Sequence, residues 1–236
     1  MRAMILAAGR GERMRPLTDK CPKPLLKVSG KALIEYHLVA LQKAGITEVV
    51  INHAWLGEKI EASLGDGARY GLSIFYSPEN NALETAGGII QALPLLVSDE
   101  EQDFLVINGD IYSNYDLRLL LKQKFSSKAH LVLVNNPLHH PQGDFFLSNG
   151  YLSTLNARQT STQEKYTFSG ISLYKAEFFA GLTQGERALA PLLKQAMLTG
   201  HVSGELYQGL WTDVGTPERL QQLENQLTAS QETVSR

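Results

Sequence analysis

Basic side chains gather near the start of the chain, in a segment that also contains two glycines. Within 14 residues lie five cationic side chains, Arg10, Arg13, Arg15, Lys20 and Lys23. Gly9 and Gly11 lack a Cβ atom, so the backbone there can turn sharply and present successive N–H groups to an anion. A loop of this kind is suited to binding a triphosphate. A basic loop exposed to solvent would have the same composition, so composition alone leaves both interpretations open.

The spacing of these residues excludes two common phosphate-binding motifs. Residues 9–14 lack the third glycine of a dinucleotide fingerprint, and no Gly-Lys-Ser/Thr follows to form a P-loop. The apolar run Ala3–Ala8 before the loop predicts a buried first strand. The basic loop therefore starts at the carboxyl end of a strand, which is where parallel sheets bind their ligands.

A carboxylate is predicted at the same edge of the sheet. The apolar strand Phe104–Ile107 ends in Asn108, Gly109 and Asp110. Mg²⁺ commonly takes one or two protein carboxylates and completes its coordination with phosphate and water oxygens. Asp110 is therefore a candidate metal ligand, although taken alone it fits a turn equally well.

The elements that must position these residues alternate between strand and helix patterns. Apolar residues at helical spacing predict a helix over 32–44 and a second around 56–64. Strands are predicted over Glu48–Ile51 and Leu72–Tyr76, so the order strand, helix, strand, helix, strand indicates a parallel sheet. A third helix, with Thr85 as its N-cap, is expected to end at Pro94.

The second half of the chain favours antiparallel strands. A short helix is predicted over 117–125 and a strand over 130–135, and the segments 145–147 and 151–155 are predicted to form a hairpin. A strand over 166–174, a helix over 191–198 and a final helix from Thr216 complete the pattern. Beyond residue 228 the chain is polar, and we expect it to be frayed.

Length and composition limit the classes of protein to which the chain can belong. A chain of 236 residues with 43% hydrophobic residues can bury one sizeable core. With 22 basic and 24 acidic residues it lacks the positive excess of nucleic-acid-binding proteins, and no apolar run is long enough for a membrane span. A single cysteine, Cys21, excludes an internal disulfide, and the N-terminus lacks a signal-peptide pattern. We therefore expect a cytoplasmic monomer that acts on small molecules.

The histidines favour structural roles over metal binding. His37 lies beside the apolar stripe of the 32–44 helix with no partner at ligand spacing, so we expect a packed side chain. His139 and His140 are adjacent, and side chains at consecutive positions diverge. We therefore expect a loop there.

Four segments resemble the sugar-1-phosphate nucleotidylyltransferases. They are Leu6–Thr18, Pro22–Pro24, Leu83–Gly88 and Trp211–Pro217. The first two are similar to the glycine-rich signature of that family, the third to its Leu-Gly-Thr-Ala-Gly loop, and the last to its Trp-x-Asp-Val/Ile-Gly-Thr-Pro motif. The chain departs from these patterns at three positions, Glu12, Lys27 and Glu84.

The resemblance implies a fold and a reaction. The fold is α/β, a Rossmann-like three-layer sandwich with a mainly parallel central sheet and a smaller antiparallel sugar-binding lobe. We expect one domain over 1–228, with a nucleotide-binding half at about 1–110 plus 211–228, a sugar-binding lobe at about 111–210, and a polar tail over 229–236. The implied reaction joins a nucleoside triphosphate to a sugar 1-phosphate and releases pyrophosphate, with Mg²⁺ as cofactor.

The same resemblance assigns residues to this reaction. The implied catalytic residues are Arg13 and Lys23, and the implied magnesium ligands are Asp110 and Asp213. The implied nucleotide-binding residues are Ala8, Gly9, Gly11, Arg13, Lys23, Thr85, Ala86, Gly87 and Asn108. The implied sugar-binding residues are Gly143, Asp144, Ser169 and Gly170. The family's Glu-Lys-Pro contact to the sugar phosphate has no clear counterpart near Glu164 and Lys165.

Within the family, the resemblance is nearest to the short bacterial N-acetylmuramate 1-phosphate uridylyltransferases, through residues 83–88, 136–145 and 167–171. UTP and N-acetylmuramate α-1-phosphate are therefore the expected substrates, in peptidoglycan recycling. A mannose-1-phosphate guanylyltransferase is the alternative within the family, and a non-catalytic nucleotide-sugar-binding regulator is the alternative of another class. The charged residues at positions 13, 23, 110 and 213 favour an enzyme.

Overall fold

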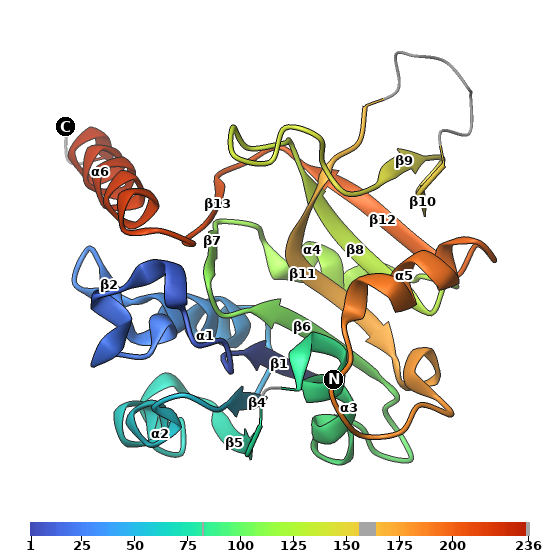
Figure 1. Ribbon diagram of the computed structural model, residues 1–236, viewed down its shortest axis with the longest axis horizontal. Coiled ribbons are helices and arrows are strands. Elements are labelled where there is room, and N and C mark those ends of the chain that lie inside the picture. Colours follow the sequence, from blue (N-terminus) through green and yellow to red (C-terminus); the bar gives the residue numbers. More distant parts are fainter. Residues whose placement is uncertain (82, 156–163, 235–236) are drawn as a thin grey trace.

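A single sheet runs through the protein. The computed structural model describes residues 1–81, 83–155 and 164–234. Over these residues the sheet has nine strands in the order β5-β4-β1-β6-β11-β8-β12-β10-β9. The first four strands are parallel: β1 (Arg2–Leu6), β4 (Glu48–His53), β5 (Ser73–Pro78) and β6 (Asp103–Asn108). Because β1 lies between β4 and β6, the loops after these three strands open at the same edge of the sheet (Figure 1).

The other five strands extend the sheet beyond β6. They are β8 (Ala129–Val134), β9 (Phe146–Ser148), β10 (Tyr151–Ser153), β11 (Thr167–Lys175) and β12 (Val202–Tyr207). β11 pairs antiparallel with both β6 and β8, and β12 is parallel to β8. β9 and β10 form the predicted hairpin at the far edge. The antiparallel part therefore continues directly from the parallel part.

Helices cover both faces of this sheet. They are α1 (Leu33–Lys43), α2 (Gly57–Leu64), α3 (Glu84–Leu96), α4 (Leu117–Lys122) and α5 (Leu189–Met197). Along β1, Ala3 and Ile5 join the core that includes α1, α2 and α4, while Met4 between them joins the core that includes α3 and α5. Successive side chains of a strand point to opposite faces, so β1 is buried on both sides. The predicted three-layer α/β fold is confirmed.

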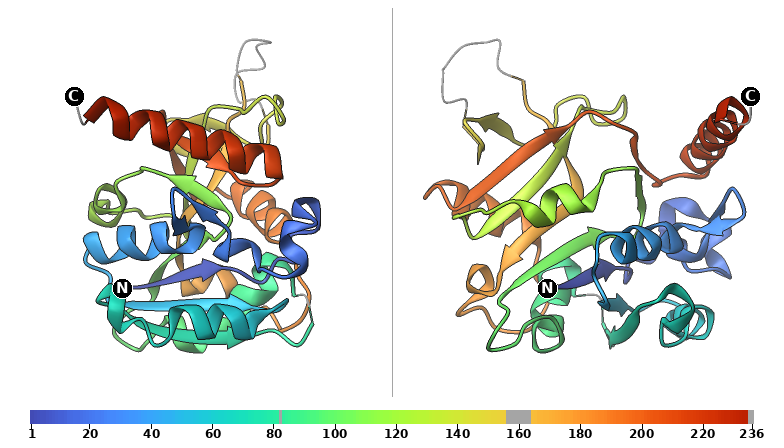
Figure 2. Two further views of the ribbon diagram at one scale, coloured as in Figure 1. Left: turned by 90° about the vertical axis from the view of Figure 1, so that its left-hand side faces the viewer. Right: turned by 180° about the vertical axis from the view of Figure 1, so that it is seen from behind.

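Smaller elements connect the ends of the chain. Two ribbons pair β2 (Lys27–Val28) with β3 (Lys31–Ala32) and β7 (Ile111–Ser113) with β13 (Trp211–Asp213). Helix α6 (Pro217–Val234) follows β13 and packs on β2, away from the main sheet (Figure 2). Short 3₁₀ helices complete the structure: η1 (Glu12–Met14), η2 (Leu17–Asp19), η3 (Lys23–Leu25), η4 (Ala68–Tyr70) and η5 (Ala176–Phe179).

Helix ends account for the main differences from the sequence expectations. Pro94 lies inside α3, which continues to Leu96 because that side chain is fully buried in the core. Thr85 is within this helix, and Leu83 is its N-cap. The last helix continues to Val234, past the point where fraying was expected. Among the described helices, none is long and apolar enough to cross a membrane.

Candidate active site

A cavity of about 920 Å³ lies at the carboxyl ends of the parallel strands. The glycine loop, residues 6–14, forms one side of it, and the start of α3 with the segment before it forms another. Predicted site residues that line the cavity are Ala8, Gly9, Gly11, Arg13, Lys23, Thr85, Asn108 and Asp110. Segments far apart in the sequence therefore converge on one concave surface, as expected for a ligand site in an open α/β sheet.

The glycine loop is shaped by Gly11. Its φ of +68° lies in the left-handed region, and its carbonyl accepts hydrogen bonds from the Thr18 hydroxyl at 2.8 Å and the Met14 N–H at 2.9 Å. A Cβ atom on Gly11 would lie 3.0 Å from Thr18 Cγ2 and 3.3 Å from Lys23 Cβ. A Cβ atom on Gly9 would have no atom of the described residues within 4 Å, apart from its chain neighbours. The conformation and packing of the loop therefore require glycine at position 11 but not at position 9.

Trp55, before α2, contacts the glycine loop and the segment that follows it. The Arg10 guanidinium carbon lies 4.8 Å from the centre of the Trp55 ring, within the range of a cation–π contact. The Trp55 indole N–H donates to the Thr18 carbonyl at 3.2 Å, and Lys59 donates to the Lys20 carbonyl at 2.7 Å. Trp55 also lines the cavity. Trp55 was not predicted from the sequence, because only the tertiary structure brings it to the loop.

A buried polar chain connects the start of the glycine loop to α3. The Ala7 N–H donates to Asn52 Oδ1 at 2.9 Å, and Asn52 Nδ2 donates to Glu79 Oε1 at 2.6 Å. Glu79 Oε2 accepts from the Leu83 N–H at 3.2 Å. Asn52 and Glu79 lie at the ends of adjacent parallel strands, and both line the cavity. Their position after apolar strands is a sequence signal that could have identified them.

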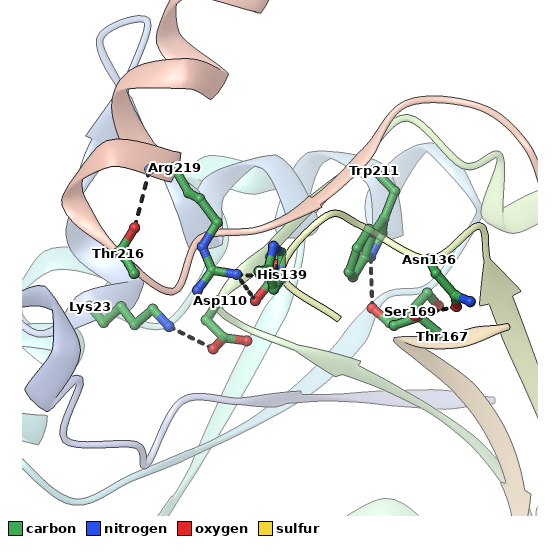
Figure 3. Close-up of polar contacts among 10 residues, drawn as sticks. Lys23, Asp110, Asn136, His139, Thr167, Ser169, Trp211, Thr216 and Arg219 are labelled. Atoms are coloured by element: carbon green, nitrogen blue, oxygen red, sulfur yellow. Dashed lines mark hydrogen bonds and ion pairs between the residues drawn. The ribbon is translucent and has the colours of Figure 1, made fainter. Parts of the chain in front are cut away.

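Lys23 and Asp110 form an ion pair in the cavity. Lys23 Nζ donates to Asp110 Oδ2 at 2.7 Å, and only 7% of Lys23 is exposed (Figure 3). Asp110 follows β6, where the Gly109 N–H donates to the Leu6 carbonyl at 2.8 Å. The Val214 N–H donates to the Asp110 carbonyl at 2.8 Å. The end of β13 is thereby attached beside Asp110.

Asp213 lies next to the cavity with two basic neighbours. Arg219 Nη1 donates to Asp213 Oδ2 at 2.6 Å, and His139 Nε2 lies 2.9 Å from Oδ1. His140 instead pairs with Asp144 at 3.1 Å, so the adjacent histidines diverge, which confirms the predicted loop. Asp213 is not part of the cavity lining, but Gly215 is. Arg219 was not predicted from the sequence, because its position in the first turn of α6 gives no chemical signal.

Asp110 and Asp213 carry the kind of donor atom that a hard divalent cation requires. Carboxylate oxygens are the ligands that Mg²⁺ prefers. Asp213 Oδ1 is buried and accepts no hydrogen bond from the described residues, because His139 Nε2, 2.9 Å away, is itself the acceptor of Arg219 Nη1. Within the described ranges, no cluster of three or more acidic, histidine or cysteine side chains could hold a metal. An ion bound here would therefore need phosphate and water oxygens besides Asp110 and Asp213.

The start of α3 presents fewer groups to the cavity than the sequence suggested. Thr85 lines it, but Ala86 and Gly87 do not. Their N–H groups donate to the Arg187 carbonyl at 3.0 and 3.1 Å, so these donors are already used. Glu84 has a φ of +55°, a left-handed conformation that favours glycine, in agreement with the glycine of the Leu-Gly-Thr-Ala-Gly pattern that this segment resembles.

The predicted sugar residues lie outside this cavity, along β11 and the loop before β9. Gly170 has a φ of +83°, and a Cβ there would lie 2.7 Å from Asn108 Cγ. The register of β11 against β8 shifts between Phe168 and Ile171, so Ser169 and Gly170 occupy an irregularity of the strand. The Ser169 carbonyl accepts from the Trp211 indole N–H at 2.8 Å (Figure 3). Gly170 thus packs directly behind Asn108 of the cavity wall.

Gly143 and Asp144 stabilise the loop that carries His139. A Cβ on Gly143, whose φ is +58°, would lie 2.5 Å from Asn136 Oδ1. Asp144 Oδ2 accepts from the Phe168 N–H at 2.8 Å. Asp144 also borders a second hollow of about 300 Å³. Both oxygens of Asp144 already have protein partners, so its contacts are those of a loop support.

His37 is packed, as predicted from the sequence. It is buried in α1, and burial lowers its pKa from 6.5 to about 4, against a smaller raising effect of the Ile111 backbone hydrogen bond and of Asp110. The imidazole is therefore neutral at pH 7.

Similarity to known proteins identifies the chain as a nucleotidyltransferase. Residues 2–145 match the nucleotidyl transferase family, and the chain belongs to that family. It is 52% identical to an N-acetylmuramate alpha-1-phosphate uridylyltransferase of Neisseria meningitidis, over 94% of this chain and 96% of that protein. It is 33% identical to a Caulobacter vibrioides protein of the same name, over 92% of each chain.

Solved structures show the same fold at lower identity. A Bacillus anthracis structure described as a glucose-1-phosphate thymidylyltransferase has a TM-score of 0.84 and 23% identity, over 95% of this chain and 94% of that one. HddC from Yersinia pseudotuberculosis, complexed with GMP-PN, has a TM-score of 0.77 and 21% identity, over 96% and 99%. Both similarities support the nucleotide-diphospho-sugar transferase fold.

Proposed function

We propose that this nucleotidyltransferase joins UTP and N-acetylmuramate α-1-phosphate to give UDP-N-acetylmuramate and pyrophosphate, in peptidoglycan recycling. The Lys23–Asp110 pair in the cavity supports this most directly, because it places a buried cation and a carboxylate beside the glycine loop. The choice of sugar and base rests on the 52% identity to the Neisseria meningitidis protein over nearly the whole chain.

The chemistry requires control of charge more than proton transfer. The attacking oxygen of a sugar 1-phosphate is already anionic near neutral pH, so no general base has to create the nucleophile. The main barrier is repulsion between that phosphate and the triphosphate, and electrostatics with positioning supply most catalysis of this type. A site with fixed cations around an anion-binding loop meets this requirement.

In this proposal each charged residue has a separate role. Arg13, exposed on the cavity wall, binds the β and γ phosphates and stabilises the departing pyrophosphate. Lys23 faces the α-phosphate and the incoming sugar phosphate. Gly9, Gly11 and Ala8 supply the backbone of the phosphate cradle. Asp110 and Asp213 would hold Mg²⁺, which would neutralise charge on the phosphates that react.

The base and the sugar occupy opposite ends of the site in this proposal. The uracil lies against residues 83–85, which line the cavity together with Glu79. The sugar lies beyond Asn108, toward Ser169 and Gly170 of β11. Gly143 and Asp144 shape the loop on that side. Ala86 and Gly87 contribute close packing of α3, since their N–H groups are already bonded to Arg187.

A guanylyltransferase is the second candidate. The chain is 30% identical to a mannose-1-phosphate guanylyltransferase of Mycobacterium tuberculosis, over 92% of this chain and 61% of that protein. Incubation with each nucleoside triphosphate and a panel of sugar 1-phosphates, followed by detection of pyrophosphate, distinguishes the two. We expect the highest kcat/KM with UTP and N-acetylmuramate 1-phosphate. A preference for GTP with mannose 1-phosphate would overturn our choice of substrates.

The same assay tests whether the protein is an enzyme at all. Lys23→Ala should lower turnover about 10² to 10³-fold, as loss of one charge-stabilising donor typically does. Binding of a nucleotide sugar without pyrophosphate formation would instead indicate a non-catalytic regulator. We further propose that the enzyme is a cytoplasmic monomer that binds neither nucleic acid nor membrane. A dimer mass in light scattering at assay concentration would contradict the monomer.

A further inference from the structure

Arg219 reaches from the first turn of α6 to the edge of the cavity. Its Nη1 donates to Asp213 Oδ2 at 2.6 Å and lies 2.6 Å from His139 Nε2 (Figure 3). The side chain is only 12% exposed, although arginine is usually among the most exposed residues. The basic group is thus held inside the protein by a single carboxylate and one imidazole.

The two aspartates of the site are matched by two basic side chains. Lys23 lies 2.7 Å from Asp110, and Arg219 lies 2.6 Å from Asp213. A divalent cation that binds both carboxylates would bring a positive charge close to these basic partners and weaken their attraction to the aspartates, because like charges repel at such distances. Metal binding would therefore leave Lys23 and Arg219 free to pair with other anions. The phosphates of the substrates would be those anions.

The position of Arg219 indicates which phosphate it would bind. Gly215 lines the cavity, and a Cβ on Gly215 would lie 2.1 Å from Arg219 Nη2, so the guanidinium lies directly along this part of the wall. His139, which also contacts Asp213, comes from the loop before β9. Gly143 and Asp144, which our proposed function places on the sugar side, stabilise this same loop. Arg219 is therefore placed for the sugar phosphate more than for the triphosphate.

We propose that Arg219 is a binding residue for the phosphate of the sugar 1-phosphate, held on Asp213 until a divalent cation occupies that carboxylate. The proposal rests on the proposed function, which identifies the anion as a sugar 1-phosphate. A guanidinium suits this role because it can bind a phosphate with two parallel hydrogen bonds, and a phosphate monoester carries about −1.5 to −2 charges at pH 7. Arg219 would thus provide the sugar-phosphate contact for which the sequence offered no candidate.

The test compares Arg219→Gln and Arg219→Lys with wild type in two measurements. The first is steady-state kinetics with each substrate varied. Arg219→Gln should raise KM for the sugar 1-phosphate about tenfold or more, as expected for a lost charge-assisted contact, and change KM for UTP less than threefold. Arg219→Lys keeps the charge and should recover part of the loss.

The second measurement is Mn²⁺ binding to the protein without nucleotide, followed by electron paramagnetic resonance. Arg219→Gln should bind Mn²⁺ at least threefold more tightly, because the guanidinium then no longer competes for Asp213, while His139 is unchanged. If Arg219 only orients Asp213, the same variant should bind Mn²⁺ more weakly and leave KM for the sugar phosphate unchanged. That result would overturn the proposal, and so would unchanged values in both measurements.

A matched control is Arg118→Gln, which removes a surface ion pair with Asp116. Arg118 does not line the cavity, so both measurements should equal wild type. Thermal unfolding of all variants checks that they are folded. Failure of the proposed function appears differently, as no pyrophosphate from wild-type protein with any substrate pair. The Mn²⁺ titration still reports on the pairing of Arg219 and Asp213 in that case.

Discussion

Replacing Gly11 by alanine should destabilise the protein and disturb Lys23 at the same time. Gly11 has a φ of +68°, and the new methyl group would lie 3.0 Å from Thr18 Cγ2 and 3.3 Å from Lys23 Cβ. Both neighbours must move by a few tenths of an ångström. Because Lys23 donates to Asp110 at 2.7 Å, its displacement changes the geometry of the proposed catalytic pair.

The expected magnitude comes from the backbone and the contacts. A left-handed conformation costs a residue other than glycine about 1–2 kcal/mol. For a chain of this size, each kcal/mol lowers the melting temperature by about 2–4 °C, so we expect a decrease of about 2–8 °C. Turnover should fall at least tenfold, because displacing a catalytic side chain by about 1 Å can lower the rate about 100-fold.

Two other glycines serve as controls in the same assays, thermal unfolding and pyrophosphate release. Gly9→Ala meets no atom within 4 Å and its φ is not left-handed, so its stability should stay within about 0.5 kcal/mol of wild type. Gly200→Ala shares the left-handed strain, with a φ of +70°, but again meets nothing within 4 Å. It should lose stability and keep turnover. Equal stability of the Gly11 and Gly9 variants would refute this reasoning.

Three further predictions concern the core and the cavity wall. Burial lowers the pKa of His37 from 6.5 to about 4, so the unfolded chain binds the extra proton first as the pH falls. The free energy of unfolding should therefore fall by up to about 3 kcal/mol between pH 7 and pH 4. In urea titrations His37→Gln should show a weaker pH dependence, and an equally steep one would contradict the burial effect. Glu79→Ala leaves the buried Asn52 donor and the half-buried Leu83 N–H without their acceptor, so it should lower the free energy of unfolding by about 1–3 kcal/mol. A loss below about 0.5 kcal/mol would exclude a structural role. Gly170→Ala places a methyl group 2.7 Å from Asn108 and should reduce turnover more than Gly200→Ala does; equal turnover would show that Asn108 tolerates displacement.

Local patterns predicted the elements of the fold well. The apolar run before Gly9 is β1, and the alternation of strands and helices gave the parallel part of the sheet. Boundaries were harder to predict, because they depend on tertiary packing. Pro94 did not end α3, since the burial of Leu96 outweighs the local preference of proline. The Arg187 carbonyl, far away in the sequence, accepts from the first N–H groups of that helix in place of a side-chain cap.

The candidate site was predictable where chemistry and strand ends coincide. Lys23 and Asp110 lie together in the cavity because each follows a turn at the same edge of the sheet. Trp55 and Arg219 were not predictable. Trp55 acts through a ring contact to Arg10, and Arg219 through a carboxylate on another element. Neither contact leaves a spacing pattern in the sequence.

In our proposal four side chains surround one metal-bound nucleotide, and a crystal structure with Mg²⁺ and a non-hydrolysable UTP analogue would show whether they do. We expect the triphosphate to lie against residues 8–13, with Arg13 and Lys23 on its oxygens and one metal ion in contact with both Asp110 and Asp213. A nucleotide bound outside this cavity, or a metal ion that touches neither aspartate, would contradict it.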